Sequence, residues 1–349
     1  MAVQKISIDD FIGIASKAIV IDVRSPGEFE HAHIIDAYSL PLFNNEERAT
    51  VGTTYKQQSR QAAIKIALPF FGEKMKAIIE TVESLVAAFE KKNTRETPTI
   101  IVHCWRGGMR SGAVAWLLDL YGFKVLQLIG GYKAYRNWAL AQFEKPYPLK
   151  VLGGYTGSGK TEILLELKRR NQTVIDLEGL AHHKGSSFGA LGQAQQPTQE
   201  MFENKLAHAL ASIEYTADGI WIEDESQRIG LVMLPTSFFT LLRNSTCYFI
   251  EIPFNERLAF ITTGYGKFDK DSLMSATLRI QKRLGGLETK TAINHIIEGN
   301  IEDAFSILLK YYDKWYEKNT QKTTSIPKLN VIRLQAEKVD PIVNASLLQ

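Results

Sequence analysis

The feature that most constrains the fold is a glycine-rich motif near the middle of the chain, GYTGSGKT at residues 154–161. It matches the pattern G-x-x-x-x-G-K-[ST], in which glycines let the backbone wrap around phosphate, a lysine supplies charge and a hydroxyl suits Mg²⁺. An apolar run at residues 149–152 precedes it and a helical stretch at 162–170 follows. The expected phosphate-binding residues are Gly154, Gly157, Ser158, Gly159, Lys160 and Thr161, with Thr161 also near the metal.

The motif predicts a polyphosphate ligand without choosing among ATP, GTP and an isoprenoid diphosphate, which present similar groups. A second element supports a metal: residues 219–225, GIWIEDE, look like a buried strand that ends in acids, as a Walker B strand does. Glu223 or Asp224 would orient the ion, and we take Asp224 as the candidate ligand beside Thr161.

The length of the chain predicts two domains, because 349 residues exceed the roughly 250–300 at which single cores split. Pro146 and Pro148 cannot continue a helix, so the junction is expected there, giving domains 1–145 and 146–349. Apolar residues make up 45% and charged residues 23%, as in folded soluble proteins. No window approaches the ~20 apolar residues of a membrane helix, and no signal peptide is recognisable. The expected location is cytoplasmic, without a membrane partner.

Hydrophobic periodicity predicts an α/β fold with parallel sheets in both halves. In the first half, residues 18–23 and 99–102 are expected strands, and residues 73–91 an expected helix. In the second half we expect further strands at 173–177, 219–222, 246–252 and 329–334, and helices at 201–217 and 301–316. Residues 178–197 lack strong periodicity and are predicted to form a mobile functional loop.

One of the two cysteines has the surroundings of a nucleophile. Cys247 lies in an apolar run typical of a buried strand, so no structural disulfide is expected. Cys104 follows the strand at 99–102 and precedes a loop and a helix at 111–118. Such a loop turns backbone N–H groups toward an anion and favours a thiolate. The candidate catalytic residues are Cys104, Arg106 and Arg110, with Gly107 and Gly108 as phosphate-binding positions.

Two families share this arrangement. Residues 22–34, DVRSPGEFEHAHI, resemble the opening motif of rhodanese domains, and residues 130–135, GGYKAY, resemble their closing motif. That resemblance implies structural roles for Asp22 and Arg24, and hydrogen-bonded loop positions for His31 and His33. The run from His103 to Ser111 equally fits the signature of cysteine phosphatases, some of which share the rhodanese fold. Three alternatives therefore stay open. The chain could be a phosphatase or a sulfurtransferase with a nucleotide-binding regulatory domain, or an ATP-dependent adaptor that carries persulfide sulfur.

The combination of the two motifs resembles one family over nearly the whole chain, the tRNA 2-selenouridine synthases. Longer matches are DLEGLAHHKGSSFG at 176–189, QPTQ at 196–199 and EDESQRIG at 223–230. The resemblance implies an N-terminal rhodanese-like domain and a C-terminal P-loop NTPase-like domain. It also implies a selenium-transferring enzyme with geranyltransferase activity. This enzyme would convert wobble 2-thiouridine in tRNA to 2-selenouridine through an S-geranylated intermediate.

The resemblance further implies geranyl diphosphate and selenophosphate as co-substrates, with Mg²⁺ and an enzyme that produces selenophosphate. We expect selenophosphate at the Cys104 loop, where Cys104 attacks or carries selenium, and geranyl diphosphate at residues 154–161. An apolar slot for the geranyl chain is expected near Phe188, Phe202 or Phe238 and Phe239. Because the net charge is only +3, tRNA must be held by local groups. The candidates are His182, His183, Phe188, Arg228, Arg279 and Arg283.

Overall fold

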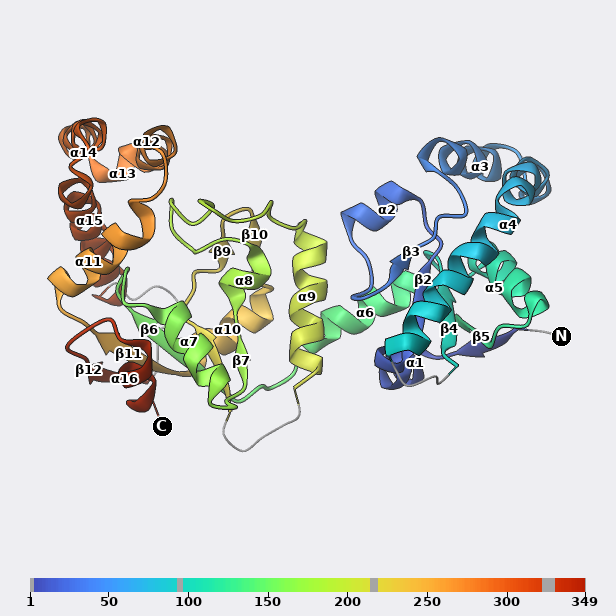
Figure 1. Cartoon of the computed structure of the whole chain (residues 1–349), viewed down its shortest axis with the longest axis horizontal. Coiled ribbons are helices and arrows are strands. Elements are labelled where there is room, and N and C mark those ends of the chain that lie inside the picture. The colour runs from blue at the N-terminus through green and yellow to red at the C-terminus, as the bar shows by residue number, and fades with distance from the viewer. Residues whose placement is uncertain (1–2, 93–96, 214–218, 322–329, 349) are drawn as a thin grey trace. The chain divides into compact units, whose positions relative to one another are not determined.

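The computed structural model of the chain describes residues 3–92, 97–213, 219–321 and 330–348 (Figure 1). These residues divide into two compact units, Met1–Gln142 (unit 1) and Phe143–Gln349 (unit 2). None of the helices within the described ranges is long and apolar enough to cross a bilayer.

Unit 1 is a parallel sheet with helices on its faces, as expected for a rhodanese-like domain. Its strand order is β1-β5-β4-β2-β3, and every neighbouring pair is parallel. The elements in chain order are β1 (Gln4–Ile6), α1 (Ile8–Ile14), a 3₁₀ turn (Ala15–Lys17), β2 (Ala18–Asp22), α2 (Pro26–His31), β3 (Tyr38–Ser39), α3 (Asn45–Gln57), α4 (Arg60–Lys92), β4 (Thr99–His103), α5 (Met109–Tyr121), β5 (Val125–Leu128) and α6 (Gly131–Gln142).

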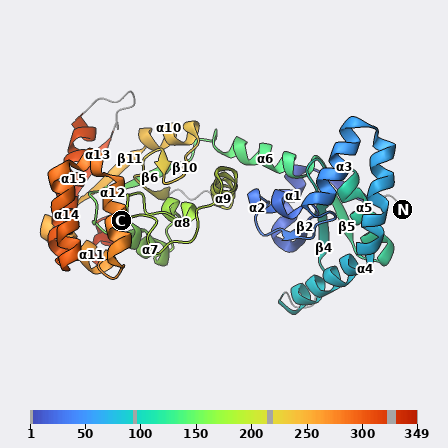
Figure 2. The same cartoon turned by 90° about the horizontal axis from the view of Figure 1, so that it is seen from above.

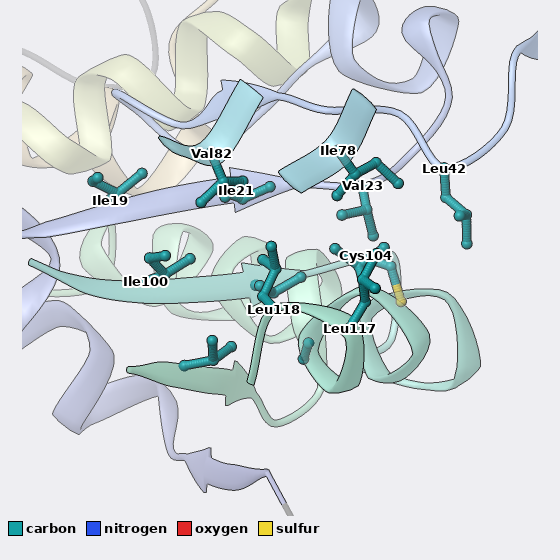
Figure 3. Packing of buried hydrophobic residues seen from close by; sticks show 14 of the residues in the cluster. Ile19, Ile21, Val23, Leu42, Ile78, Val82, Ile100, Cys104, Leu117 and Leu118 are labelled. Carbon is teal, nitrogen blue, oxygen red and sulfur yellow. The ribbon is translucent and has the colours of Figure 1, made fainter. Parts of the chain in front are cut away.

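The core of unit 1 places β4 so that Cys104 follows it directly. Side chains alternate along a strand, so Ile100 and Val102 face one side of the sheet, where they pack with Ile78 of α4 and Leu118 of α5 (Figure 3). The predicted strands at 18–23 and 99–102 are confirmed. The helix predicted over 73–91 is part of α4, which begins earlier and continues through Pro69.

A buried ion pair fixes the end of β2 beside the cysteine loop. Asp22 and Arg24 are 0% and 1% exposed, and the Arg24 guanidinium donates to the Asp22 carboxylate at 2.6 and 2.9 Å. Arg24 also donates to the carbonyl of Ala32 at 2.7 Å and lies 3.9 Å from the ring centroid of Tyr132. The pair therefore ties β2, the segment after α2 and α6 together, as the rhodanese resemblance implies.

Replacing Asp22 by Asn is expected to destabilise the protein by about 3–5 kcal/mol, since it leaves the Arg24 charge buried without its partner. Urea denaturation of the full chain, followed by circular dichroism, measures this change. As a control, Lys76→Ala breaks the exposed pair between Lys76 and Glu80 and should leave the curve unchanged. Equal midpoints for the wild type and Asp22→Asn would contradict the structural role of the pair.

Unit 2 is also built on a parallel sheet, with the order β12-β11-β6-β8-β7, and carries a separate antiparallel hairpin, β9–β10. Its elements are β6 (Leu149–Gly154), α7 (Lys160–Arg169), β7 (Val174–Ile175), α8 (Leu177–Ala181), α9 (Gln199–Ala211), β8 (Ile220–Glu223), β9 (Arg228–Ile229), β10 (Val232–Met233), α10 (Thr236–Asn244), β11 (Thr246–Glu251), α11 (Phe254–Tyr265), α12 (Lys270–Arg279), α13 (Gln281–Leu284), α14 (Gly286–Glu298), α15 (Ile301–Gln321), β12 (Val331–Gln335) and α16 (Pro341–Ser346).

The central strand β6 leads into the phosphate-binding motif. The chain passes from β6 to β7 and β8 on one side and then to β11 and β12 on the other. Ligands of such sheets bind at this switch point, beyond the carboxyl ends of the strands. Strands lie where the sequence predicts them, although β7 is shorter than predicted. Of the predicted helix 201–217, the last four residues lie outside the described residues, and α9 ends at Ala211. Residue 329 of the last predicted strand is outside them too.

The prediction of a mobile loop at 178–197 is wrong for its first part, which forms α8. Asp176 caps this helix by accepting from the Gly179 N–H at 2.6 Å. The rest is tied down: Ser187 is bonded to the Tyr312 hydroxyl at 2.7 Å, and the Gln196 amide donates to the Ala181 carbonyl at 2.9 Å. Such polar contacts, one of them to a residue 125 positions away, leave no hydrophobic period for a sequence pattern to reveal. Tyr312 belongs to α15. This helix lies with α11–α14 beside the sheet (Figure 1 and Figure 2).

Candidate functional site

The Cys104 loop of unit 1 joins β4 to α5 and is closed by the start of α6. The N–H groups of Tyr132 and Lys133 donate to the carbonyls of Cys104 and Trp105 at 2.8 and 2.9 Å. At Gly131, φ is +55°, and a Cβ would lie 2.3 Å from the Cys104 carbonyl oxygen. Only glycine fits there, which explains the paired glycines of the closing motif.

The thiol of Cys104 is buried, 4% exposed, at the end of the core cluster in Figure 3. Its Sγ lies 3.3 Å from the Ser111 hydroxyl. Burial acts against the thiolate, but the hydroxyl and N–H of Ser111, the charge of Arg110 and the N–H of Gly108 outweigh it and lower the pKa of the thiol. Gln127 donates to the carbonyls of Gly107 and Gly108, which fixes the loop. The site therefore favours a nucleophilic thiolate.

The two arginines predicted beside the thiol differ in the structure. Arg110 pairs with Glu28 at 2.7 Å, which anchors it at the loop, while Arg106 is exposed. The pKa of Glu28 is lowered, because Arg110 and Arg48 outweigh the effect of its burial. The Nδ1–H of His33 donates to the Phe29 carbonyl at 2.9 Å, as expected of a loop residue. The contributions of Arg106 and Arg110 to anion binding stay predictions.

Replacing Ser111 by Ala should raise the pKa of the Cys104 thiol, since the charged form loses the hydroxyl beside it. Alkylation by iodoacetamide, which requires the thiolate, should then begin at a higher pH than in the wild type. Intact-mass spectrometry across a pH series gives the midpoint, and Cys104→Ser reports any background from Cys247. A midpoint that stays in place or moves to lower pH would contradict the role of Ser111.

The phosphate-binding loop of unit 2 runs from the end of β6 to the start of α7. Gly157 and Gly159 have φ of +83° and +71°, and a Cβ on Gly157 would lie 2.6 Å from Cδ1 of Ile261. Gly154 and Ser158 also pack closely, because a Cβ on Gly154 would lie 2.5 Å from the Ser158 hydroxyl oxygen. Close packing thus requires glycine at these positions of the motif, in addition to the predicted approach of phosphate to the backbone.

Acids surround the two functional side chains of the loop. Lys160 is half-buried and donates to the Gly154 carbonyl at 3.1 Å. Burial opposes its charge, but Tyr316 and the carboxylates of Glu178 and Glu225 raise its pKa. The Thr161 hydroxyl donates to Glu178 at 2.9 Å. Burial, and then Glu178, raise the pKa of Glu225 to about 8. Glu225 can therefore carry a proton near neutral pH beside the loop.

The acids predicted as metal ligands have other contacts. Asp224 pairs with Arg243 at 2.5 Å, and the carboxylate in contact with Thr161 is that of Glu178. Glu223 accepts from the N–H of Leu177 at 2.9 Å, and burial raises its pKa well above its usual range. Among the described residues, no three His, Cys, Asp or Glu side chains cluster to hold a metal. Mg²⁺ needs few protein ligands when a diphosphate supplies the others, and Thr161 with Glu178 offers the hard oxygens that it prefers.

A cavity of about 1160 Å³ opens from the phosphate-binding loop. Its lining combines the loop and the acids Glu178, Asp224 and Glu225 with many apolar and aromatic side chains, and with polar ones such as Lys184 and Lys267. Its apolar lining includes Phe188, Phe239, Phe249, Phe260, Ile261, Tyr265, Phe268, Phe305, Leu308, Leu309, Trp315 and Tyr316. Of the aromatic residues predicted to form a slot, Phe188 and Phe239 line this cavity, while Phe202 and Phe238 are buried elsewhere.

A buried clamp holds the loop against the helices that carry the apolar lining. Arg257 of α11 donates to the Thr156 carbonyl at 3.0 Å and pairs with both oxygens of Asp313 of α15 at 2.9 and 2.8 Å. Its guanidinium also lies 5.0 Å from the ring centroid of Tyr155. Sequence patterns did not reveal Arg257, Arg243, Glu178 or Tyr316 as parts of the site, because each reaches the loop only through the tertiary fold.

The residues predicted to contact tRNA stay predictions, and several of them lie near the 182–189 segment, where Arg279 donates to the Ser187 carbonyl at 2.7 Å. His182 Nδ1 is 2.8 Å from the Gln195 carbonyl oxygen, and its Nε2 is 3.3 Å from the Lys205 ammonium. Burial, followed by the charge of Arg279, lowers the pKa of His183. Arg228 is exposed on β9, whereas Arg279 and Arg283 are exposed on the helices α12 and α13.

The role predicted for Phe188 as a stacking platform for a nucleobase is wrong. Its side chain is 3% exposed and packs in the core cluster of unit 2 against Phe305, with ring centroids 5.6 Å apart. A ring this deeply buried is not accessible for stacking on a base. The polar segment around it gave no periodic signal of burial, which explains the error.

Comparisons with known proteins cover both units. Residues 12–137 match the rhodanese-like domain, and residues 147–345 match the tRNA 2-selenouridine synthase AAA domain. The tRNA 2-selenouridine synthase of Hydrogenovibrio crunogenus is 35% identical, covering 90% of this chain and 92% of the relative. That of Sulfurovum sp. is 33% identical, covering 88% and 90%, and that of Bdellovibrio bacteriovorus is 33% identical, covering 97% and 98%. With its two units each matched to one of these domains, the chain belongs to the tRNA 2-selenouridine synthase family.

Proposed function

We propose that the protein converts wobble 2-thiouridine in tRNA to 2-selenouridine through an S-geranylated intermediate, with geranyl diphosphate and selenophosphate as co-substrates. The observation that carries the proposal is the cavity of unit 2, which joins a diphosphate-binding loop to an apolar, aromatic wall. ATP and GTP would use the loop but leave that wall without an apolar partner, whereas an isoprenoid diphosphate uses both. The names of the relatives, tRNA 2-selenouridine synthase, support tRNA as the substrate and selenium as the element that is transferred.

In the first step the sulfur of 2-thiouridine attacks carbon 1 of the geranyl group, a C–S bond forms and the C–O bond to diphosphate breaks. The leaving group gains negative charge, which Lys160 and the N–H groups of the loop stabilise. A Mg²⁺ ion bound with the diphosphate would be held by Thr161 and Glu178 and would add positive charge there. The apolar wall holds the geranyl chain away from water.

In the second step selenium from selenophosphate attacks carbon 2 of the ring, and the geranylated sulfur departs as a thiolate. Water releases the phosphate, so that the products are 2-selenouridine, geranylthiol and phosphate. The Cys104 loop suits a single tetrahedral oxyanion and would hold the phosphate of selenophosphate, with the Cys104 thiol, whose pKa the loop lowers, beside it. An enzyme that makes selenophosphate is the partner that this step requires.

The test is mass spectrometry of nucleosides from 2-thiouridine tRNA incubated with the protein, geranyl diphosphate and selenophosphate. We expect S-geranyl-2-thiouridine when selenophosphate is omitted and 2-selenouridine when both donors are present. Absence of both products would refute the proposal. Turnover of para-nitrophenyl phosphate without nucleoside change would favour the phosphatase alternative instead.

A further inference from the structure

The loop that carries the reactive thiol has large apolar side chains at its two ends. Trp105 and Met109 are 39% and 45% exposed, whereas Cys104 is 4% exposed. Phosphate gains nothing from such side chains, because its oxygens bind to cations and to N–H groups. The ends of the loop therefore fit a ligand that has an apolar surface, in addition to the anion expected at the centre of the loop.

The ring of Trp105 is held in place by the core of unit 1. Its centroid lies 5.7 Å from that of Tyr132. The Tyr132 ring is 0% exposed and packs in turn against the Arg24 guanidinium, which the Asp22 carboxylate fixes. The backbone is fixed as well, since the Trp105 carbonyl accepts from the N–H of Lys133 at 2.9 Å. A stack that begins at a buried ion pair thus ends in a partly exposed aromatic ring.

Two exposed cations belong to the same part of the loop. Arg106 follows Trp105 directly, and Lys133 is tied to the Trp105 carbonyl through its N–H. Proteins bind unpaired nucleotides with this combination, in which aromatic rings stack on bases and cations contact the phosphates. Bases in single-stranded RNA loops are turned outward onto aromatic side chains in the same way. The Cys104 loop therefore has both parts of a binding site for a nucleotide in an RNA loop.

We infer that Trp105 stacks on the S-geranylated uracil ring and holds its carbon 2 beside the selenium donor, while Arg106 and Lys133 contact the neighbouring phosphates. This inference rests on the proposed function and assigns the base-binding position of its second step. Alkylation at sulfur takes the proton from N3, so the ring presents hydrogen-bond acceptors and a flat face but no N–H donor. Stacking needs only that face, and it leaves carbon 2 open to attack.

The experiment is single-turnover selenation of S-geranyl-2-thiouridine tRNA by the full chain with selenophosphate, at subsaturating tRNA. Trp105→Ala should lower the rate by roughly 5- to 150-fold, the range for loss of one base–aromatic stack. Trp105→Leu should be similarly slow, because it restores apolar bulk without a π-face, and Trp105→Phe should recover most of the rate. Geranylation of 2-thiouridine tRNA at saturating tRNA, which is assigned to unit 2, should continue in Trp105→Ala.

Trp116→Ala is the matched control, because Trp116 is 48% exposed on α5 of the same unit and lies outside the loop. It should keep the wild-type rate of selenation. Alkylation of Cys104 by iodoacetamide should have the same pH midpoint in Trp105→Ala as in the wild type, which reports an intact loop. Without selenophosphate, binding of the geranylated tRNA should quench tryptophan fluorescence, and the quench should shrink in Trp105→Phe but not in Trp116→Phe.

The outcomes separate this inference from the proposed function. If the wild type neither geranylates nor selenates tRNA, the proposed function itself fails. If it performs both steps, but Trp105→Ala or Trp105→Leu selenates as fast as the wild type, the stacking role is overturned. A shifted alkylation midpoint in Trp105→Ala also overturns it, since the ring would then act on the thiol. Equal slowing of geranylation and selenation, or equal slowing by Trp116→Ala, has the same consequence, because the ring would then serve folding or general tRNA binding.

Discussion

Cys104→Ser is expected to reduce the selenation of S-geranyl-2-thiouridine tRNA by about a thousandfold or more, while geranylation continues. A serine hydroxyl is not ionised near neutral pH, so the contacts with Ser111, Arg110 and the Gly108 N–H that lower the pKa of the thiol have no anion to stabilise. Geranylation takes place in unit 2 under our proposal and does not use this thiol. Single-turnover assays with pregeranylated tRNA and selenophosphate measure the selenation step alone.

Cys247→Ser is the matched control for this experiment. Cys247 is 1% exposed on β11, and its replacement should leave both steps intact in the folded protein. If Cys104→Ser retained selenation and lost geranylation, the two ligand assignments would be reversed. Retention of both steps would show that the thiol has no part in the chemistry.

Lys160→Ala should lower the rate of geranyl transfer by about 10²- to 10³-fold, the range for removing a group that stabilises developing charge. Lys160 lies in the phosphate-binding loop, and its ammonium is the charge closest to the expected diphosphate. Its removal also takes away the cation that lowers the pKa values of Glu178 and Glu225, so these buried carboxyls become easier to protonate. Nucleoside mass spectrometry after incubation with geranyl diphosphate measures the effect.

Lys168→Ala provides the comparison, because Lys168 is exposed on the same helix, α7. It should retain full geranyl transfer. Selenation of pregeranylated tRNA should also survive in Lys160→Ala, which separates the two steps. Steady ATP hydrolysis that depends on Lys160, without any change in tRNA nucleosides, would instead support an adaptor that carries persulfide sulfur.

Much of the fold could be predicted because its signals are local. Short β-branched runs such as residues 18–22 and 99–103 become central strands, since parallel strands are buried on both faces. The glycine motif predicts its own strand, loop and helix. Helix α4 shows the limit of local rules: Pro69 lies within it, although proline usually ends a helix. Packing of Ile78 and Val82 against the sheet stabilises a helix that the local pattern would have started later.

The site was harder to predict where its residues meet only after folding. Lys160 and Thr161 could be named from the motif, but their partners Glu178 and Glu225 come from separate segments, and Arg257 reaches the loop from α11. Phe188 illustrates the opposite error. It was named both as part of an apolar slot and as a platform for a nucleobase, and it lines the apolar cavity with its ring buried in the core. Burial of an isolated aromatic ring depends on distant helices, and a single sequence contains no pattern that shows this.

Because Gly131 packs against the Cys104 carbonyl, the surroundings of the reactive thiol depend on a segment that lies later in the chain. Residues 130–133, which follow β5, hold the Cys104 loop through the N–H groups of Tyr132 and Lys133 and the close fit of Gly131. In a chain still emerging from the ribosome, Cys104 has an ordinary, mostly protonated thiol. We therefore expect the thiol to react more readily with oxidants and electrophiles once unit 1 has folded than before.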